Sequence, residues 1–115
     1  MRREYRLTNN ASFNYIYKKG ELISSQIVNI MYVRATSVKV GISVSKKIGN
    51  SVTRSLVKRR IKESFRLLIP QLTGKYNYVL VARPGIEKTD YTHIAGEIKR
   101  LLGKARHISN VESIS

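Results

Sequence analysis

Apolar residues alternate with small or polar ones in the middle of the chain. From Val38 to Lys46 the alternation is regular, which predicts a strand with one core face and one unusually flat face. Residues 27–35 and 76–82 are rich in β-branched and aromatic side chains, so they are predicted to be two further strands. The nearly continuous apolar run at 76–82 is typical of a central strand buried on both faces.

Three other segments space their apolar residues three and four positions apart, as an amphipathic helix does. The predicted helices span residues 9–19, 51–68 and about 90–102, with caps at Asn9 or Asn10, Asn50 or Ser51, and Thr89 or Asp90. In the middle helix the buried row is predicted to be Val57, Ile61, Phe65 and Leu68.

The resulting order is α-β-β-α-β-α, with room for an extra short strand at 21–24. This order predicts a single domain over residues 1–115, an α/β (α+β) two-layer sandwich with one mixed sheet. The ordered core is expected at about 3–103, and the polar residues 104–115 are expected to fray.

Charge narrows the choice of partner. The 115 residues include 22 Lys and Arg against 7 Asp and Glu, a net charge of +15, and no acidic residue lies between Glu21 and Glu63. Such an excess destabilises the fold by self-repulsion, so a polyanionic partner is expected. No apolar run approaches the ~20 residues of a membrane helix, and a cytoplasmic protein that does not bind membranes is predicted.

The positive charge gathers where nucleic acid would be bound. Arg54, Lys58, Lys62 and Arg66 recur at intervals of four along the middle helix, and Lys46 and Lys47 precede it. Cations combined with aromatic side chains suit single-stranded RNA. The candidate platforms are Phe13, Tyr17, Met31, Tyr32 and Tyr78, for which stacking and core packing are equally open. The basic helix alone does not separate RNA from DNA.

Catalytic chemistry is weakly represented. The acidic residues are isolated, and His93 and His107 lack metal-binding or triad partners in the sequence, so neither catalytic nor metal-binding residues are predicted. Ser43 and Lys46 match the S-x-x-K pattern of serine acyl-transferases, but they lie on a predicted strand without the companion motifs. The two alternatives are a ribosomal or other structural RNA-binding protein, and a hydrolase that uses Ser43 and Lys46.

One stretch is highly specific. Residues 41–54 read GISVSKKIGNSVTR and residues 57–63 read VKRRIKE. This stretch closely resembles the signature of the protein subunit of bacterial ribonuclease P. The segment from Arg6 through Phe13 and Tyr17 to Gly20 is similar to the family's opening helix, and 78–83 to a later strand. The resemblance covers about residues 3–102.

The resemblance implies a ribosomal-protein-S5-domain-2-like fold with a left-handed βαβ crossover. It also implies a ribonucleoprotein that removes the 5′ leader from precursor tRNA by hydrolysis. In this family the RNA subunit is the catalyst and uses Mg²⁺, held mainly through RNA, and the protein binds no cofactor of its own. The implied partners are the RNA subunit and the leader, with no small-molecule substrate.

Residue pattern and resemblance together predict two sets of binding residues. The expected RNA-subunit set is Lys46, Lys47, Asn50, Arg54, Lys58, Arg59, Arg60, Lys62 and Arg66. The expected leader set is Phe13, Tyr17, Met31, Tyr32, Ser43 and Ser45, in a cleft between the first helix and the sheet.

The chain departs from the family at one place. Arg54-Ser55-Leu56 stands where the family usually has Arg-Asn-Arg. Leu56 falls about 140° from the buried row, so it is predicted to be exposed. Arg60 lies one turn later, and our hypothesis is that it partly replaces the missing charge.

Overall fold

The computed structural model describes residues 2–108. One mixed sheet has the strand order β1-β2-β4-β3. Its strands are β1 (Glu21–Ser24), β2 (Val28–Arg34), β3 (Lys39–Ser43) and β4 (Tyr76–Ala82), and the helices are α1 (Asn10–Lys19), α2 (Ser51–Arg66) and α3 (Tyr91–Lys104). β2 pairs antiparallel with both β1 and β4, whereas β3 runs parallel to β4. The predicted element order and the short strand at 21–24 are confirmed.

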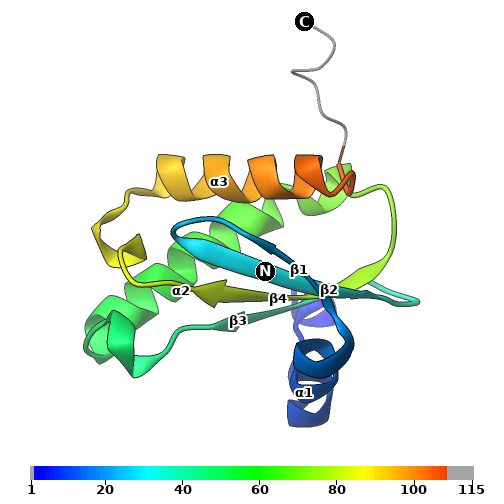
Figure 1. Cartoon of the computed structure of the whole chain (residues 1–115), viewed down its shortest axis with the longest axis horizontal. Coiled ribbons are helices and arrows are strands. Elements are labelled where there is room, and N and C mark those ends of the chain that lie inside the picture. The colour runs from blue at the N-terminus through cyan, green and yellow to red at the C-terminus, as the bar shows by residue number, and fades with distance from the viewer. Residues whose placement is uncertain (1, 109–115) are drawn as a thin grey trace, which may run out of the picture.

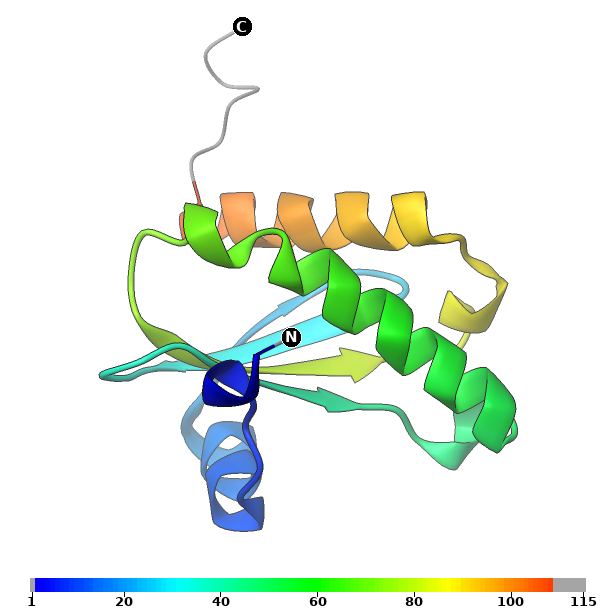
Figure 2. The ribbon, with the colours of Figure 1, turned by 180° about the vertical axis from the view of Figure 1, so that it is seen from behind.

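The helices cover the two faces of the sheet unequally (Figure 1). Helices α2 and α3 pack side by side over one face, and α1 lies against the opposite face at one end of the sheet, as Figure 2 also shows. The predicted sandwich is therefore correct for the sheet and the α2–α3 layer, and α1 adds a partial third layer. Helix α2 connects the parallel strands β3 and β4, and the left-handed sense of that crossover stays a prediction.

The core lies between the sheet and the α2–α3 layer. All four residues of the predicted row on α2 and its C-terminal extension are buried: Val57, Ile61, Phe65 and Leu68. Helix α3 contributes Ile94, Ile98, Leu101 and Leu102, and β4 contributes Tyr78 and Leu80. This burial makes the apolar side of α2 unavailable to a partner and turns its cations outward.

The chain beyond α3 differs from the prediction. His107 and Ile108 are 3% and 4% exposed, and Ile108 pairs with Leu72 in an antiparallel bridge. The His107 carbonyl also accepts a hydrogen bond from the Thr73 N–H at 2.8 Å. The segment predicted to fray from residue 104 is therefore packed as far as Ile108, and the rest of that predicted tail lies outside the described residues.

Candidate nucleic-acid interface

The loop before α2 has a backbone fixed by three residues. Ile48 is buried and anchors the short turn η2 (Lys46–Ile48), which leaves Lys46 and Lys47 exposed. Gly49 has φ 156° and ψ −165°, and a Cβ there would lie 3.0 Å from Thr53 Cγ2, so only glycine suits the position. Asn50 then caps α2, because its Oδ1 accepts a 2.9 Å hydrogen bond from the Thr53 N–H.

The capping contact gives Asn50 a structural role in addition to the RNA-binding role predicted for it. With Val57, Ile61 and Phe65 inward, the exposed cations of the helix are Lys58, Arg59 and Arg66, and Arg54 and Lys62 are half-buried.

Two of the predicted RNA-binding cations already have protein partners. The Arg66 guanidinium donates through Nε and Nη2 to Glu63 Oε2 at 3.1 and 2.9 Å. That hydrogen bond is the main reason that the pKa of Glu63 is lowered. Arg60 Nη1 donates to the Thr89 carbonyl at 3.0 Å and so connects α2 to the turn before α3. This contact holds the half-buried Arg60 side chain against the turn before α3.

A polar groove of about 410 Å³ runs between β3 and the first turns of α2. Ser43, Ser51, Ser55, Arg54 and Lys58 contribute its polar lining. Arg54 Nε is buried without a hydrogen-bond partner among the residues that the structure describes. A buried guanidinium N–H that lacks an acceptor is costly, so an anionic ligand would satisfy it.

A second groove of about 290 Å³ adjoins the first and shares Ile42 and Lys58 with it. Arg6, Phe13 and Lys62 line it, and the N-terminal segment closes one side, where the Leu7 N–H donates to the Val40 carbonyl at 2.9 Å. We call the two recesses together the β3 groove. Four cations line it: Arg6, Arg54, Lys58 and Lys62.

Phe13 reaches the β3 groove because position 41 is glycine. A Cβ on Gly41 would lie 2.3 Å from Phe13 Cζ and 2.6 Å from Cε1, far inside van der Waals contact. The flat face predicted for β3 is therefore occupied at this point by the chain's own Phe13. Helix α1 holds the ring there, and its N-cap is Asn9, whose Oδ1 accepts from the Ala11 N–H at 2.7 Å.

The predicted leader set is divided by the sheet. Side chains of a strand alternate between faces, and Met31 of β2 points toward the face that carries α1, like Phe13 and the 43%-exposed Tyr17. Tyr32 points to the opposite face, where its hydroxyl donates to Glu21 Oε2 at 2.9 Å. Burial, aided by that hydrogen bond, raises the pKa of Tyr32 to about 12.

Tyr32 therefore does not share a surface with Phe13 and Tyr17, which corrects its place in the leader set. Tyr78 is also excluded as a stacking platform, because it is fully buried in the core. Ser43 is half-buried in the β3 groove, and Ser45 is exposed just before η2.

The structure gives the hydrolase alternative no support within residues 2–108. The Ser43 hydroxyl has no recorded hydrogen bond to Lys46, and no cluster of three His, Cys, Asp or Glu residues that could hold a metal occurs there. His93 is exposed on α3, and His107 is a packing residue. Over the same range, no helix is both long enough and apolar enough to span a bilayer.

Comparison with known proteins decides the family. The family model for ribonuclease P matches residues 1–106. This chain belongs to the bacterial ribonuclease P protein component family. The family's enzyme is an endoribonuclease that matures the 5′ end of tRNA, and the chain is a component of that RNA-binding ribonucleoprotein.

Individual relatives agree with the family model. The ribonuclease P protein component of Clostridium novyi is 39% identical over 110 residues, covering 91% of this chain and 96% of that protein. The crystallised Staphylococcus aureus RNase P protein is 29% identical, with a TM-score of 0.83 over 91% of this chain and 98% of that chain. The Thermotoga maritima RNase P protein, at 21% identity and a TM-score of 0.78, shares the fold.

Sequence reasoning missed Arg6 as a lining residue of the β3 groove. Its signal was present in the basic segment Arg2, Arg3 and Arg6. What the sequence did not reveal is that residues 6–7 return to the edge of β3, where Arg6 forms a bridge with Val40.

Proposed function

We propose that this chain binds the catalytic RNA subunit of ribonuclease P through α2 and the loop before it, and holds the 5′ leader of precursor tRNA along the β3 groove and the α1 face of the sheet. Hydrolysis of the phosphodiester is performed by the RNA subunit. The Mg²⁺ that it needs is held mainly through RNA. Working with these RNAs places the protein in the cytoplasm.

The observation that carries this proposal is that an aromatic side chain and two lysines line the same recess at the edge of β3. Phe13 arrives from the α1 face, and Lys58 and Lys62 arrive from α2 on the other face, yet all three line one recess. Cations beside an aromatic ring match what a single strand offers, phosphates along its backbone and bases that can stack.

The two RNAs are proposed to meet on α2 and to share some of its cations. Lys58 and Arg54 line the β3 groove, so they are assigned to the leader path as well as to the RNA subunit. Arg59, Lys46 and Lys47 are exposed without a recorded hydrogen bond or ion pair among the described residues, so they are assigned to the RNA subunit. Glu63 already neutralises much of the charge of Arg66, which makes Arg66 the weakest member of the set.

The test is the double substitution Lys58→Glu with Lys62→Glu, compared with Lys88→Glu and Lys99→Glu. Both pairs change the net charge equally, and Lys88, in the turn before α3, and Lys99, on α3, are exposed and do not line the β3 groove. Affinity for a ribonuclease P RNA, and cleavage of precursor tRNA at low Mg²⁺, are measured for both variants and the parent protein.

We expect the substitutions of Lys58 and Lys62 to weaken RNA-subunit binding at least tenfold. The control substitutions of Lys88 and Lys99 should change it by no more than threefold, and thermal stability should be preserved in both variants. Equal losses in the two variants would show that only net charge matters, and the proposed interface would be wrong. Unfolding of the α2 variant would contradict the outward position of the two lysines.

A further inference from the structure

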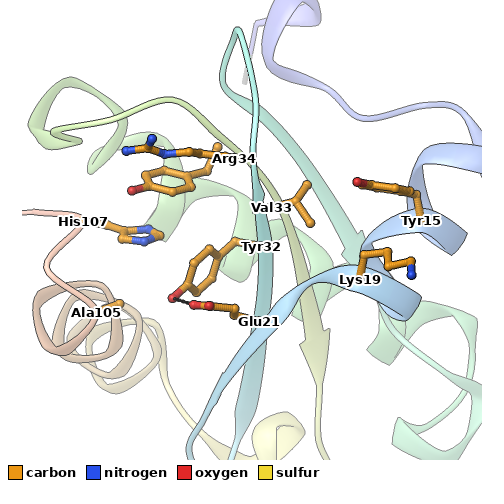
Figure 3. Close-up of a pocket in the computed structure, with 9 residues that line it drawn as sticks. Tyr15, Lys19, Glu21, Tyr32, Val33, Arg34, Ala105 and His107 are labelled. Carbon is orange, nitrogen blue, oxygen red and sulfur yellow. Dashed lines mark hydrogen bonds between the residues drawn. The ribbon is translucent and has the colours of Figure 1, made fainter.

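A recess of about 580 Å³ lies at the edge of the sheet opposite to the β3 groove. It opens where β1 begins, and its lining includes Tyr15, Lys19, Glu21, Arg34, Tyr76 and His107 (Figure 3). Because β1 and β3 are the two outer strands, this recess is separated from the β3 groove by the width of the sheet.

At the recess, the end of β2 has no strand beside it on the β1 side among the described residues. Glu21, the first residue of β1, pairs with Tyr32, so β2 continues for two residues without β1 beside it. The Ala35 N–H donates to the Lys75 carbonyl, on the β4 side. Backbone groups alternate in direction along a strand, so the N–H and C=O of Arg34 point away from β4 into the space that β1 leaves open. Within residues 2–108, a donor and an acceptor without a backbone partner therefore lie side by side at this edge.

Side chains suited to a base and a phosphate surround that edge. Tyr15 on α1 is 58% exposed, and Figure 3 shows its ring and Lys19 on one side of β2, with Arg34 and His107 on the other. Lys19 and Arg34 supply two positive charges. Glu21, the acidic residue among the described lining residues, already accepts the hydrogen bond from the Tyr32 hydroxyl.

The inner wall of the recess is rigid. Tyr76 stacks on His107 with ring centroids 3.9 Å apart and planes within 10°, and the Tyr32 ring meets the imidazole edge-on at 4.3 Å. The wall therefore does not have to be ordered when a ligand enters, which favours binding.

We propose that this recess binds one unstacked nucleotide. Its base lies against the Tyr15 ring, and the hydrogen-bonding edge of the base meets the Arg34 N–H and C=O. The phosphate lies beside the Arg34 guanidinium, across β2 from Tyr15, and the Lys19 ammonium adds positive charge on the Tyr15 side. Every nucleobase has a donor beside an acceptor on its pairing edge, so the site selects nucleotides with little preference among bases. The nucleotide is either part of a bound RNA or a free nucleotide.

The first test titrates the protein with uridine 5′-monophosphate and follows backbone amides by NMR. We expect saturable shifts at Val33 and Arg34, weakened at least fivefold by Tyr15→Ala and by Arg34→Gln. The matched controls are Tyr91→Ala, an exposed tyrosine on α3, and Lys99→Gln, and neither should change the affinity. Tyr15 and Arg34 are both exposed, so folding should be intact, which a thermal melt checks.

Three results would overturn the proposal: no saturable shift at Arg34, the same shifts with inorganic phosphate alone, or equal losses from Tyr15→Ala and Tyr91→Ala.

A second measurement shows whether the bound nucleotide belongs to an RNA strand or is a free nucleotide. Ribonuclease P is assembled with its RNA subunit and precursor tRNA containing 4-thiouridine, and crosslinks are mapped. A crosslink mapped to Val33 or Arg34, recess residues outside the leader set, identifies an RNA strand, whereas uridine monophosphate binding without such a crosslink identifies a free nucleotide. Neither result depends on the assignment of Lys58 and Lys62.

Discussion

The hydroxyl of Tyr78 and Nδ1 of His107 are joined by a hydrogen bond of 2.8 Å inside the protein. Tyr78 belongs to β4 at the centre of the sheet, and His107 lies just beyond the end of α3. The contact therefore ties the C-terminal end of α3 to the middle of the sheet, with Tyr32 and Tyr76 packed around the imidazole.

The burial of His107 makes stability depend on pH. Desolvation lowers the pKa of His107 below its usual 6.5, although the nearby Glu21 carboxylate acts in the opposite direction. The unfolded chain then binds the proton more readily, so the free energy of unfolding is full above about pH 6.5 and decreases as the pH falls toward the folded-state pKa. The slope for one proton is at most about 1.4 kcal/mol per pH unit.

Urea unfolding between pH 5 and pH 8 measures this dependence. His107→Gln should flatten the part of the curve below pH 6.5, whereas His93→Gln, which changes an exposed side chain on α3, should leave the curve as in the parent. A parent curve that is flat in that range, or one that changes equally in both variants, would exclude His107 as the cause.

The contact between Phe13 and Gly41 predicts a selective defect. In Gly41→Ala the new methyl group would lie 2.3 Å from Phe13 Cζ, so the ring must leave the β3 groove. We expect a loss of about 1–3 kcal/mol in stability and weaker binding of precursor tRNA than of mature tRNA. The control is Gly96→Ala on α3, where a Cβ has no neighbour within 4 Å and should slightly stabilise the helix. Unchanged stability and unchanged leader binding in Gly41→Ala would show that Phe13 has no fixed position.

Tyr17 offers a test of leader binding that does not disturb the core, since it is 43% exposed. Stacking of a base on an aromatic ring is worth about 1–3 kcal/mol. Tyr17→Ala should therefore weaken binding of precursor tRNA with a leader by at least fivefold and leave binding of mature tRNA nearly unchanged. Affinities for both ligands are measured with the assembled ribonucleoprotein, with Tyr91→Ala as the control. Equal losses for precursor and mature tRNA would exclude a leader contact.

The departure at Ser55-Leu56 can be tested through Leu56 and Arg60 separately. Leu56 is 42% exposed, as predicted, so Leu56→Arg should add a phosphate contact and raise RNA-subunit affinity without loss of stability. Arg60→Leu should instead reduce thermal stability, because the Thr89 carbonyl loses its donor. If Arg60→Leu lowers only RNA affinity, Arg60 acts as the replacement charge that the sequence suggested.

The sequence was most informative where one periodicity controls the structure. The row Val57, Ile61 and Phe65 faces the core as predicted, and its burial alone directs Lys58 and Arg59 outward. The sequence could not place Tyr32, because β2 carries apolar residues on both faces, and the pattern does not show which face meets α1. Burial of His107 was equally hidden, since its partners Tyr76 and Tyr78 are about 30 residues away and the cations Lys104 and Arg106 lie just before it.

Membership of the ribonuclease P protein family leads to a final prediction about whether the protein or the RNA subunit performs hydrolysis. Cleavage of a phosphodiester at neutral pH requires an activated nucleophile and stabilisation of charge on the leaving oxygen. The seven acidic residues of this chain are scattered, and none lies between Glu21 and Glu63. The β3 groove instead offers cations that neutralise repulsion between two RNAs and position a leader.

We therefore expect no cleavage of precursor tRNA by the purified protein, with or without Mg²⁺. Adding a ribonuclease P RNA should produce mature tRNA with a 5′-phosphate, and at low Mg²⁺ the reaction should require the protein, because its cations lower the repulsion that Mg²⁺ otherwise screens. Ser43→Ala and His93→Ala should keep the single-turnover rate of the assembled enzyme within a few-fold of the parent. If the RNA-free protein cleaves precursor tRNA robustly, and Ser43→Ala abolishes that cleavage, the catalyst is the protein groove beside Ser43 and not the RNA subunit.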